Sequence, residues 1–310
     1  SFRVATRFLF FLRQAGRYLL HAFLWLFLLL WGLLLYNLPF DRGPVAFRPL
    51  LEQAVPLQLI SYQAGPAAHP SPVVCALRDG GQDTTVLFIH GSPGSGPDFA
   101  PYLADSSLFA RARLATLDRP GFGLSAGSGA LGLAEQSRRL GPLVAYLRAR
   151  GPLILAGHSL GGPLAVRLAM DYPQQVDGLV LLAAALDPAL EEMAWYNELL
   201  DLRAVQWMMP DALVYSNREI QGLKQDLEDM LPRYHSLRQP IVLVQGGADE
   251  LVSPSNADFA RFRLSHLPIV WDLPPQVGHL FPFDEPQRVR QAVHRSLHQL
   301  GVVHGPPASG

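Results

Sequence analysis

The sequence predicts an α/β fold in which a mostly parallel sheet is flanked by helices. Short apolar runs of strand length recur along the chain and are separated by helix-like or Gly-rich stretches. One such run, at 153–156, turns through Gly-x-Ser-x-Gly into a helix-like segment at 163–170. The 310 residues are enough to bury a sizeable core. The length suits one large α/β domain as well as two small ones, and the strand pattern with the Gly-x-Ser-x-Gly turn indicates the α/β class.

The predicted strands are runs of apolar or β-branched residues bounded by turn residues. They are 54–62, 73–77, 85–89, 114–118, 153–156, 178–185, 241–245 and 269–273. A Pro/Ala/Ser-rich turn at 65–72 separates the first two, which are expected to pair with each other. Apolar residues at helical spacing predict helices at 133–150 and 286–300, the first of which would cover one face of the sheet.

Composition excludes several classes of function. Hydrophobic residues make up 49% of the chain and charged residues 16%, with a formal net charge of −1. Such a chain has no global field to attract nucleic acid, so no nucleic-acid partner is expected. Cys75 is the only cysteine, which rules out an internal disulfide and a cysteine metal site.

The high proportion of hydrophobic residues comes largely from residues 18–38, which contain no Asp, Glu, Lys or Arg. A helix of this length spans roughly 30 Å, the thickness of a hydrocarbon core. A basic segment at 1–17 precedes it, and a Gly/Pro-containing linker at 39–50 follows. Because positive residues prefer the cytoplasmic side, we expect the amino terminus inside and the remaining chain extracytoplasmic, in the periplasm if the source is Gram-negative.

Two other interpretations of 18–38 compete with a membrane anchor. A cleaved signal peptide usually has a shorter apolar region and small residues before its cleavage site, and Tyr36-Asn-Leu-Pro-Phe40 offers no such site. A buried core helix is the other, but an all-round apolar helix is uncommon at the terminus of a soluble enzyme. We therefore expect an uncleaved, single-pass transmembrane helix.

The stretch Gly157-His-Ser-Leu-Gly161 lies between a predicted strand and a predicted helix, which is the context of a nucleophile elbow. Such a turn strains the serine backbone, and the glycines remove side chains that would clash across it. Ser159 would then project above the sheet, with the backbone N–H of Leu160 free to bind an oxyanion. The simpler alternative is a tight turn whose serine caps the following helix.

Two loops that precede the elbow extend this pattern. His90-Gly-Ser-Pro-Gly94 follows one predicted strand, and Asp118-Arg-Pro-Gly-Phe-Gly-Leu-Ser125 follows the next. With the elbow, and in this order, they make residues 50–300 resemble the α/β-hydrolase superfamily, in particular its capped, serine-nucleophile, esterase- or lipase-like members. The match to the family's oxyanion loop implies that the backbone N–H of Ser92 is the second donor, opposite Leu160.

The loop after residue 118 is expected to have a structural role. Its glycines permit a tight turn beside the active site, and Asp118 with Arg119 would lock the turn by ion pairing. Neither residue is expected to take part in catalysis.

A serine nucleophile needs a general base, and the base needs an orienting acid. In the superfamily that the chain resembles, the acid follows the serine along the chain, and the histidine follows the acid. Asp249 lies in a Gly-rich loop just after the strand at 241–245, which makes it the expected acid. Its neighbour Glu250 and Asp187, after the preceding strand, are the alternatives.

His279 is the expected base because it follows the last predicted strand and a loop, and precedes the helix at 286–300. His158 and His90 are expected to be packing residues beside the nucleophile and in the oxyanion loop. His294 and His298 share a helix face at a spacing that could bind metal, but no acidic ligand pattern accompanies them, so we expect no metal site.

Residues 187–239 are too long for a simple crossover and are expected to form a helical cap over a hydrolase core made of 51–186 and 240–302. Helices are predicted at 191–208 and 211–230, broken at Pro210. The cap supplies an apolar set that would pack it on the core and partly line the pocket: Trp195, Tyr196, Leu199, Leu200, Trp207, Met208 and Met209.

The sequence thus predicts a membrane-anchored serine hydrolase, without metal or organic cofactor, that cleaves a carboxylic ester. A lipid-derived ester is among the candidate substrates. An aminopeptidase or amidase of the prolyl-iminopeptidase type is the alternative within the superfamily, and Glu191, Glu192 or Glu198 would then bind the substrate amine. A non-catalytic interaction protein with the same fold is the alternative from another class. Acyl transfer to an acceptor other than water also stays open, and the sequence does not indicate the oligomeric state.

Overall fold

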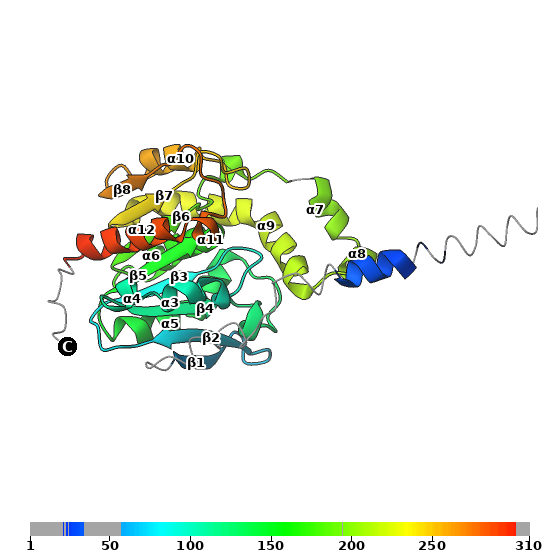
Figure 1. The fold of residues 1–310 in the computed structure, drawn as a ribbon, viewed down its shortest axis with the longest axis horizontal. Helices are drawn as coiled ribbons and strands as arrows, with labels where there is room; N and C mark the ends of the chain where they lie inside the picture. The colour runs from blue at the N-terminus through cyan, green and yellow to red at the C-terminus, as the bar shows by residue number, and fades with distance from the viewer. Residues whose placement is uncertain (1–20, 22, 24, 34–56, 194, 302–310) are drawn as a thin grey trace, which may run out of the picture. The chain divides into compact units, whose positions relative to one another are not determined.

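The computed structural model describes residues 21, 23, 25–33, 57–193 and 195–301. The chain divides into two units, Ser1–Pro39 and Phe40–Gly310, and Figure 1 shows the second as a sheet with helices packed against it. Its strands are β1 Leu57–Ala64, β2 Ser71–Arg78, β3 Thr85–Ile89, β4 Arg113–Asp118, β5 Leu153–His158, β6 Gly178–Leu182, β7 Ile241–Val244 and β8 Ile269–Asp272. Its α-helices are α3 Ala100–Leu103, α4 Ser106–Phe109, α5 Leu133–Arg148, α6 Gly161–Asp171, α7 Trp195–Leu200, α8 Arg203–Gln206, α9 Asp211–Met230, α10 Asn256–Arg263, α11 Phe281–Asp284 and α12 Pro286–Gln299.

The eight strands form one sheet in the order β1-β2-β4-β3-β5-β6-β7-β8. β2 is antiparallel to both β1 and β4, and β3 to β8 pair in parallel. The carboxyl ends of the parallel strands therefore lie at one edge of the sheet, where α/β folds place their ligand sites. The predicted, mostly parallel sheet flanked by helices is confirmed.

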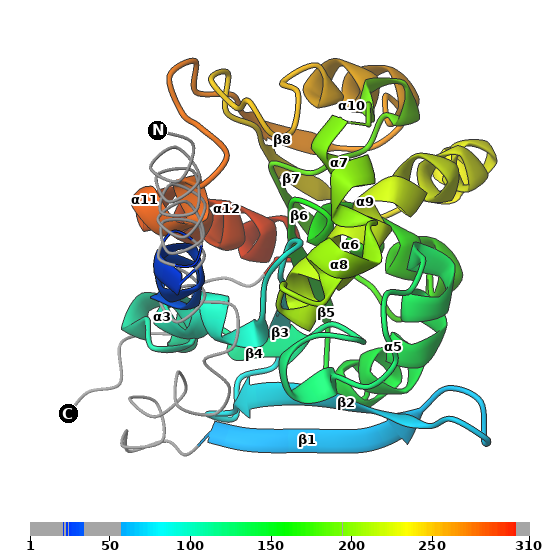
Figure 2. The same ribbon diagram turned by 90° about the vertical axis from the view of Figure 1, so that its right-hand side faces the viewer.

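Helices cover both faces of the sheet, and each face has its own hydrophobic core. One core joins the sheet to α5, α6 and α10, and includes Leu140, Leu164 and Ala260. The other joins it to α3, α4 and α12, and includes Leu103 and Val293. Figure 2 shows α3 and α12 on one side of the sheet and α5 and α6 on the other. The central strands β3, β5 and β6 are buried along their whole length, which fits their continuous apolar sequences.

Each predicted strand corresponds to a strand of the sheet, and the helices predicted at 133–150, 211–230 and 286–300 correspond to α5, α9 and α12. Residues 54–56 of the first predicted strand lie outside the described residues. The strand predicted at 178–185 stops at Leu182, because Ala183 has a φ of 46° that no strand accommodates. The helix predicted at 211–230 has these bounds in α9. The helix predicted at 191–208 is wrong: two short helices, α7 and α8, occupy it, because Leu202 is extended (φ −64°, ψ 126°) and ends the helical run.

The segment predicted as a cap follows β6, and its helices α7 to α9 lie beyond one end of the strands (Figure 1). The carboxyl-terminal part of α9 is anchored in the core by Leu223, Leu227 and Met230. Amide hydrogen bonds tie α7 to α9, where the Asn197 side chain donates to Oδ1 of Asn217 at 2.7 Å. The carboxyl-terminal part of α9 therefore holds this segment to the core through apolar contacts, and Glu219 in the middle of the helix adds an ion pair with Arg119.

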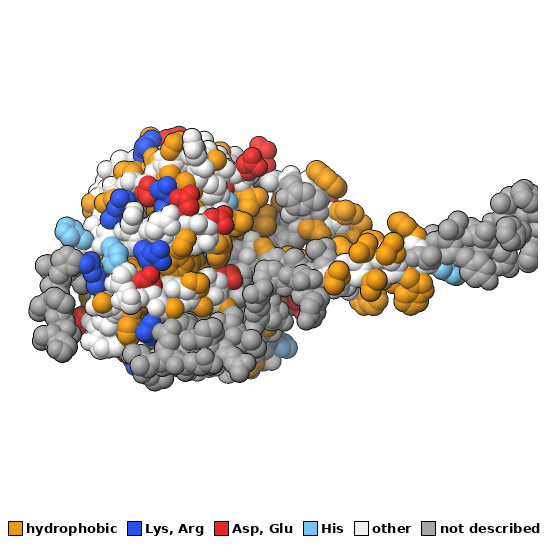
Figure 3. Space-filling view, in the orientation of Figure 1, with side chains coloured by type: hydrophobic (Ala, Val, Ile, Leu, Met, Phe, Trp, Pro, Cys, Tyr) orange, Lys and Arg blue, Asp and Glu red, His pale blue; other side chains and the backbone are white. Residues whose placement is uncertain are grey.

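Residues 18–20, 22, 24 and 34–38 of the predicted membrane-spanning segment, 18–38, lie outside the described residues. Its described residues, 21, 23 and 25–33, are helical, and the apolar side chains among them are largely exposed (Figure 3); Trp25 is 73% exposed. Within the described part of the chain, no helix combines the length and apolar character needed to cross a membrane.

Candidate active site

Ser159 lies at the turn between β5 and α6, and its backbone φ is 53°. This left-handed conformation is strained for a residue other than glycine. A Cβ at Gly157 would overlap the backbone of Gly161, and a Cβ at Gly161 would overlap the carbonyl oxygen of Ile89. The glycines therefore let the turn close on itself. Leu160, and not the serine, takes the N-cap position of α6, so the simpler interpretation of Ser159 as a helix cap is wrong.

Asp249 and His279 are joined by a hydrogen bond of 2.9 Å between Oδ2 and Nδ1. Asp249 also accepts from the backbone N–H groups of Leu251 and Val252. Burial raises the pKa of the Asp249 carboxyl, but the hydrogen bonds from His279 and from these N–H groups outweigh it, so the pKa lies below its ordinary value. The ionised carboxylate accepts from Nδ1–H, which leaves Nε2 of His279 as the proton acceptor.

The two alternative acids are placed elsewhere. Asp187 caps a short 3-10 helix, Pro188–Leu190, through a hydrogen bond from the N–H of Ala189. Glu250 is exposed to solvent next to the buried Asp249. Of the three carboxylates considered, only Asp249 is hydrogen-bonded to His279.

His158 packs against His279, with 4.8 Å between the ring centroids, and its Nε2 lies 3.2 Å from the carbonyl oxygen of His279. Burial, together with the neighbouring His279, lowers the pKa of His158 to about 3. The ring is therefore neutral at physiological pH, and Nε2–H donates to the carbonyl oxygen. His158 thus fixes the backbone of His279, which agrees with its predicted packing role.

His90 occupies the loop after β3. Its Nε2 accepts from the backbone N–H of Arg119 at 2.9 Å, so Nδ1 carries the proton and donates to the carbonyl oxygen of Gly91 at 2.8 Å. Burial, with the charge of Arg119, holds the pKa of His90 well below its ordinary value, which keeps this tautomer neutral. A Cβ at Gly91 would lie 3.0 Å from Cβ of Ser159, so the backbone of this loop passes directly beside the serine.

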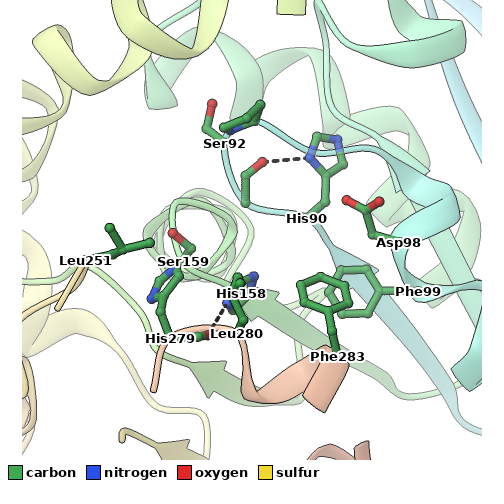
Figure 4. Close-up of a pocket in the computed structure, with 12 residues that line it drawn as sticks. His90, Ser92, Asp98, Phe99, His158, Ser159, Leu251, His279, Leu280 and Phe283 are labelled. Carbon is green, nitrogen blue, oxygen red and sulfur yellow. Dashed lines mark hydrogen bonds between the residues drawn. The ribbon is translucent and has the colours of Figure 1, made fainter. Parts of the chain in front are cut away.

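Ser159, His279 and Ser92 line one pocket of about 240 Å³, and Figure 4 shows the side chains of Ser159 and His279 next to each other. Asp98 is the one carboxylate among its described lining residues. The apolar part of the wall is formed by Pro93, Phe99, Leu251, Leu280 and Phe283. None of the described residues that line the pocket belongs to 187–239, so the apolar lining predicted from the cap is not found there.

The predicted ion pair between Asp118 and Arg119 is wrong. Arg119 instead pairs with Glu219 of α9 at 2.8 Å. Asp118 accepts from the backbone N–H groups of Gly96 and Leu124 and so stabilises the turns on both sides of it. The motif locks its loop as expected, but through backbone groups and not through its own arginine.

Sequence reasoning missed Glu219, and no local pattern in α9 distinguishes it from the other acidic residues of that helix. It also missed the apolar wall of the pocket. Leu251 and Leu280 could have been found, because each lies within two residues of a predicted site residue.

A sequence model of the alpha/beta hydrolase fold matches residues 84–211, which include the loop after β3 and the elbow. The chain has the α/β-hydrolase fold. The chain is 36% identical over 89 residues to a pimeloyl-[acyl-carrier protein] methyl ester esterase of Edwardsiella ictaluri. That match covers 28% of this chain and 32% of the relative, so the chain spans about a third of the length of the curated relative it matches.

Solved structures share the fold of this chain. A thermophilic esterase from Thermogutta terrifontis is 21% identical with a TM-score of 0.62, and the match covers 78% of this chain and 99% of that chain. A membrane phospholipase A is 21% identical with a TM-score of 0.61, and the match covers 93% of this chain and 99% of that chain. At these identities the likeness shows the fold alone.

Proposed function

We propose that this chain is a membrane-anchored serine hydrolase that cleaves a carboxylic ester through an acyl-enzyme. Ser159 is the nucleophile, His279 the general base and Asp249 the orienting acid. The observation that carries the proposal is the 2.9 Å Asp249–His279 hydrogen bond, with His279 and the strained Ser159 lining one pocket. A hydroxyl, an imidazole and an ionised carboxylate in this arrangement have the roles that nucleophilic catalysis requires.

The proposed mechanism has two halves. His279 Nε2 takes the proton of Ser159 Oγ, which attacks the ester carbonyl carbon. The oxyanion accepts from the backbone N–H groups of Ser92 and Leu160. Collapse breaks the ester C–O bond, and the alcohol leaves with the proton from His279. Water then gives a proton to His279 and attacks the acyl carbon, and release of the acid restores the hydroxyl of Ser159.

A lipid-derived ester is the substrate class that we favour. The pocket, at about 240 Å³, is smaller than is usual for drug-sized ligands, so it would hold the reacting ester with short flanking groups. Leu251 and Leu280, at 73% and 51% exposed, extend the apolar wall outward, where a longer acyl chain could lie. A membrane phospholipase A shares the fold over 93% of this chain, so the fold is compatible with such a substrate.

The aminopeptidase alternative needs an acidic group to bind the substrate amine. None of the three candidates, Glu191, Glu192 and Glu198, is among the described residues that line the pocket. The geometry around Ser159 therefore gives the alternative less support than it gives the ester.

The test uses the full-length chain in detergent micelles. We expect wild type to be labelled by a fluorophosphonate and to hydrolyse p-nitrophenyl esters of graded chain length, whereas Ser159→Ala should be neither labelled nor active. An aminoacyl-nitroanilide is the parallel substrate for the alternative. If folded wild type is not labelled and turns over none of these substrates, the enzyme interpretation fails and the non-catalytic one stands.

A further inference from the structure

The cap helix α9 carries a buried glutamate that reaches the loop beside the serine. The carboxylate of Glu219 and the guanidinium of Arg119 form two parallel hydrogen bonds of 2.8 and 2.9 Å, with side-chain exposures of 1% and 0%. Gln136 of α5 donates to Glu219 at 2.7 Å and accepts from Arg119 at 3.1 Å. The ion pair is therefore bidentate, buried and hydrogen-bonded on its flanks.

The same two side chains hold the loop after β3. Arg119 Nη2 donates to the carbonyl oxygen of Gly91 at 2.9 Å, and Ser92 Oγ donates to Oε2 of Glu219 at 2.6 Å. Since His90 Nδ1–H also donates to the Gly91 oxygen, at 2.8 Å, that oxygen accepts two hydrogen bonds, one of them from a charged donor.

The Gly91 carbonyl and the Ser92 N–H belong to one peptide unit. A trans peptide is planar and its C=O and N–H point in opposite directions, so fixing the oxygen fixes the direction of the N–H. A cation at the oxygen also polarises the peptide and makes its N–H a stronger donor. Arg119 therefore acts on the group that the proposed function uses to bind the oxyanion.

We propose that Arg119 and Glu219 are positioning residues for the oxyanion hole, and that through them the cap helix α9 sets the orientation of the Gly91–Ser92 peptide. The inference rests on the proposed function, because it assigns a task to the Ser92 N–H. A role in stability alone would not need a buried ion pair, since apolar pairs of similar volume often do as well or better.

The test replaces the pair by apolar residues, Arg119→Met with Glu219→Leu, so that no unpaired charge is left in the core. We expect kcat for p-nitrophenyl butyrate to fall about 10- to 100-fold, with KM changed less than about twofold. Affinity for an alkyl boronic acid, whose adduct carries the oxyanion, should fall in parallel with kcat. If Arg119 and Glu219 had a structural role only, the folded double variant would keep the kcat and the boronic-acid affinity of wild type.

A matched control replaces a remote ion pair, Arg113→Met with Asp79→Leu, whose atoms lie 2.9 Å apart at the turn before β3. Its kcat should equal that of wild type. If the first double variant does not fold, the same measurements are made on Arg119→Lys. Lysine keeps the charge but cannot bind Glu219 and Gly91 together. If a folded variant keeps the kcat of wild type, the inference is wrong, and turnover by wild type still upholds the proposed function. If wild type neither turns over the ester nor is labelled, both are wrong.

Discussion

Asp249 and Glu250 are neighbours with opposite environments, and this difference defines a test at the scale of single residues. Asp249 is buried and hydrogen-bonded to His279, whereas Glu250 is exposed. Asn at 249 would leave the geometry intact but favour the wrong tautomer of His279, so we expect Asp249→Asn to lower kcat by about 10⁴-fold. Glu250→Gln is the matched control and should keep wild-type kcat. Equal losses in both variants, measured with one p-nitrophenyl ester, would contradict the assignment.

His158 predicts a dependence of stability on pH. Its pKa falls from an ordinary 6.5 to about 3 in the folded chain, so between these values only the unfolded state binds the proton. Protonation then favours unfolding, and His158 makes the free energy of unfolding fall as pH falls from 6.5 towards 3, by at most about 1.4 kcal/mol per unit. Between pH 7 and pH 5, we expect the free energy of unfolding to fall by about 1–2 kcal/mol less in His158→Gln than in wild type, as measured by urea titration at each pH. If the free energy of unfolding falls equally in both proteins, another group, such as His90, governs stability in this pH range.

The site residues that the sequence predicted share one property: each lies within a few residues of the end of a strand. Ser159, Asp249 and His279 are of this kind, and a parallel sheet brings such ends to one edge whatever the rest of the chain does. Glu219 could not be predicted this way, because it lies in the middle of a helix and its partner Arg119 is 100 residues away. The expected Asp118–Arg119 pair was wrong for the same reason, since adjacent residues gave no sign of a distant carboxylate.

At the scale of elements, the elbow and α9 contain glycines with opposite surroundings. A Cβ at Gly161 would overlap backbone oxygen atoms of Ile89 and His90, which cannot move aside, whereas Gly222 in α9 has open space around it. We expect Gly161→Ala to destabilise the fold by more than about 3 kcal/mol. Gly222→Ala should raise Tm by about 2 °C, because alanine has the higher helix propensity. Thermal unfolding of both variants checks this, and a stable, active Gly161→Ala would contradict the elbow geometry.

Element prediction succeeded where an apolar pattern was long and failed where tertiary contacts ended a helix. The helix at 211–230 was read correctly because its apolar spacing continues for its whole length. The segment 191–208 has helix-forming residues throughout, yet Asp201 accepts hydrogen bonds from Asn217 and Gln221 of α9, and the chain turns there. Such contacts are invisible in a single sequence, so propensity alone predicted one helix where two form.

At the scale of the whole molecule, the proposed anchor separates two environments. The unit Phe40–Gly310 carries a thiol, Cys75, that is fully buried, so the fold tolerates an oxidising or a reducing compartment alike. The compartment therefore has to be inferred from the charges that flank residues 18–38. Arginines before that segment favour a cytoplasmic amino terminus and an extracytoplasmic hydrolase unit.

Topology is testable with two reporters fused after Gly310 of the full chain. A reporter that is active only outside the cytoplasm should be active, and one that is active only in the cytoplasm should be silent. Replacing the flanking arginines by glutamine should shift activity towards the second reporter, because the positive charges set the orientation. The arginines in question are Arg3, Arg7, Arg13 and Arg17. Substitution of the exposed Arg138 and Arg261 should leave the ratio unchanged. A cytoplasmic reporter active in the unmodified chain would overturn the proposed topology and leave the assignment of Ser159 untouched.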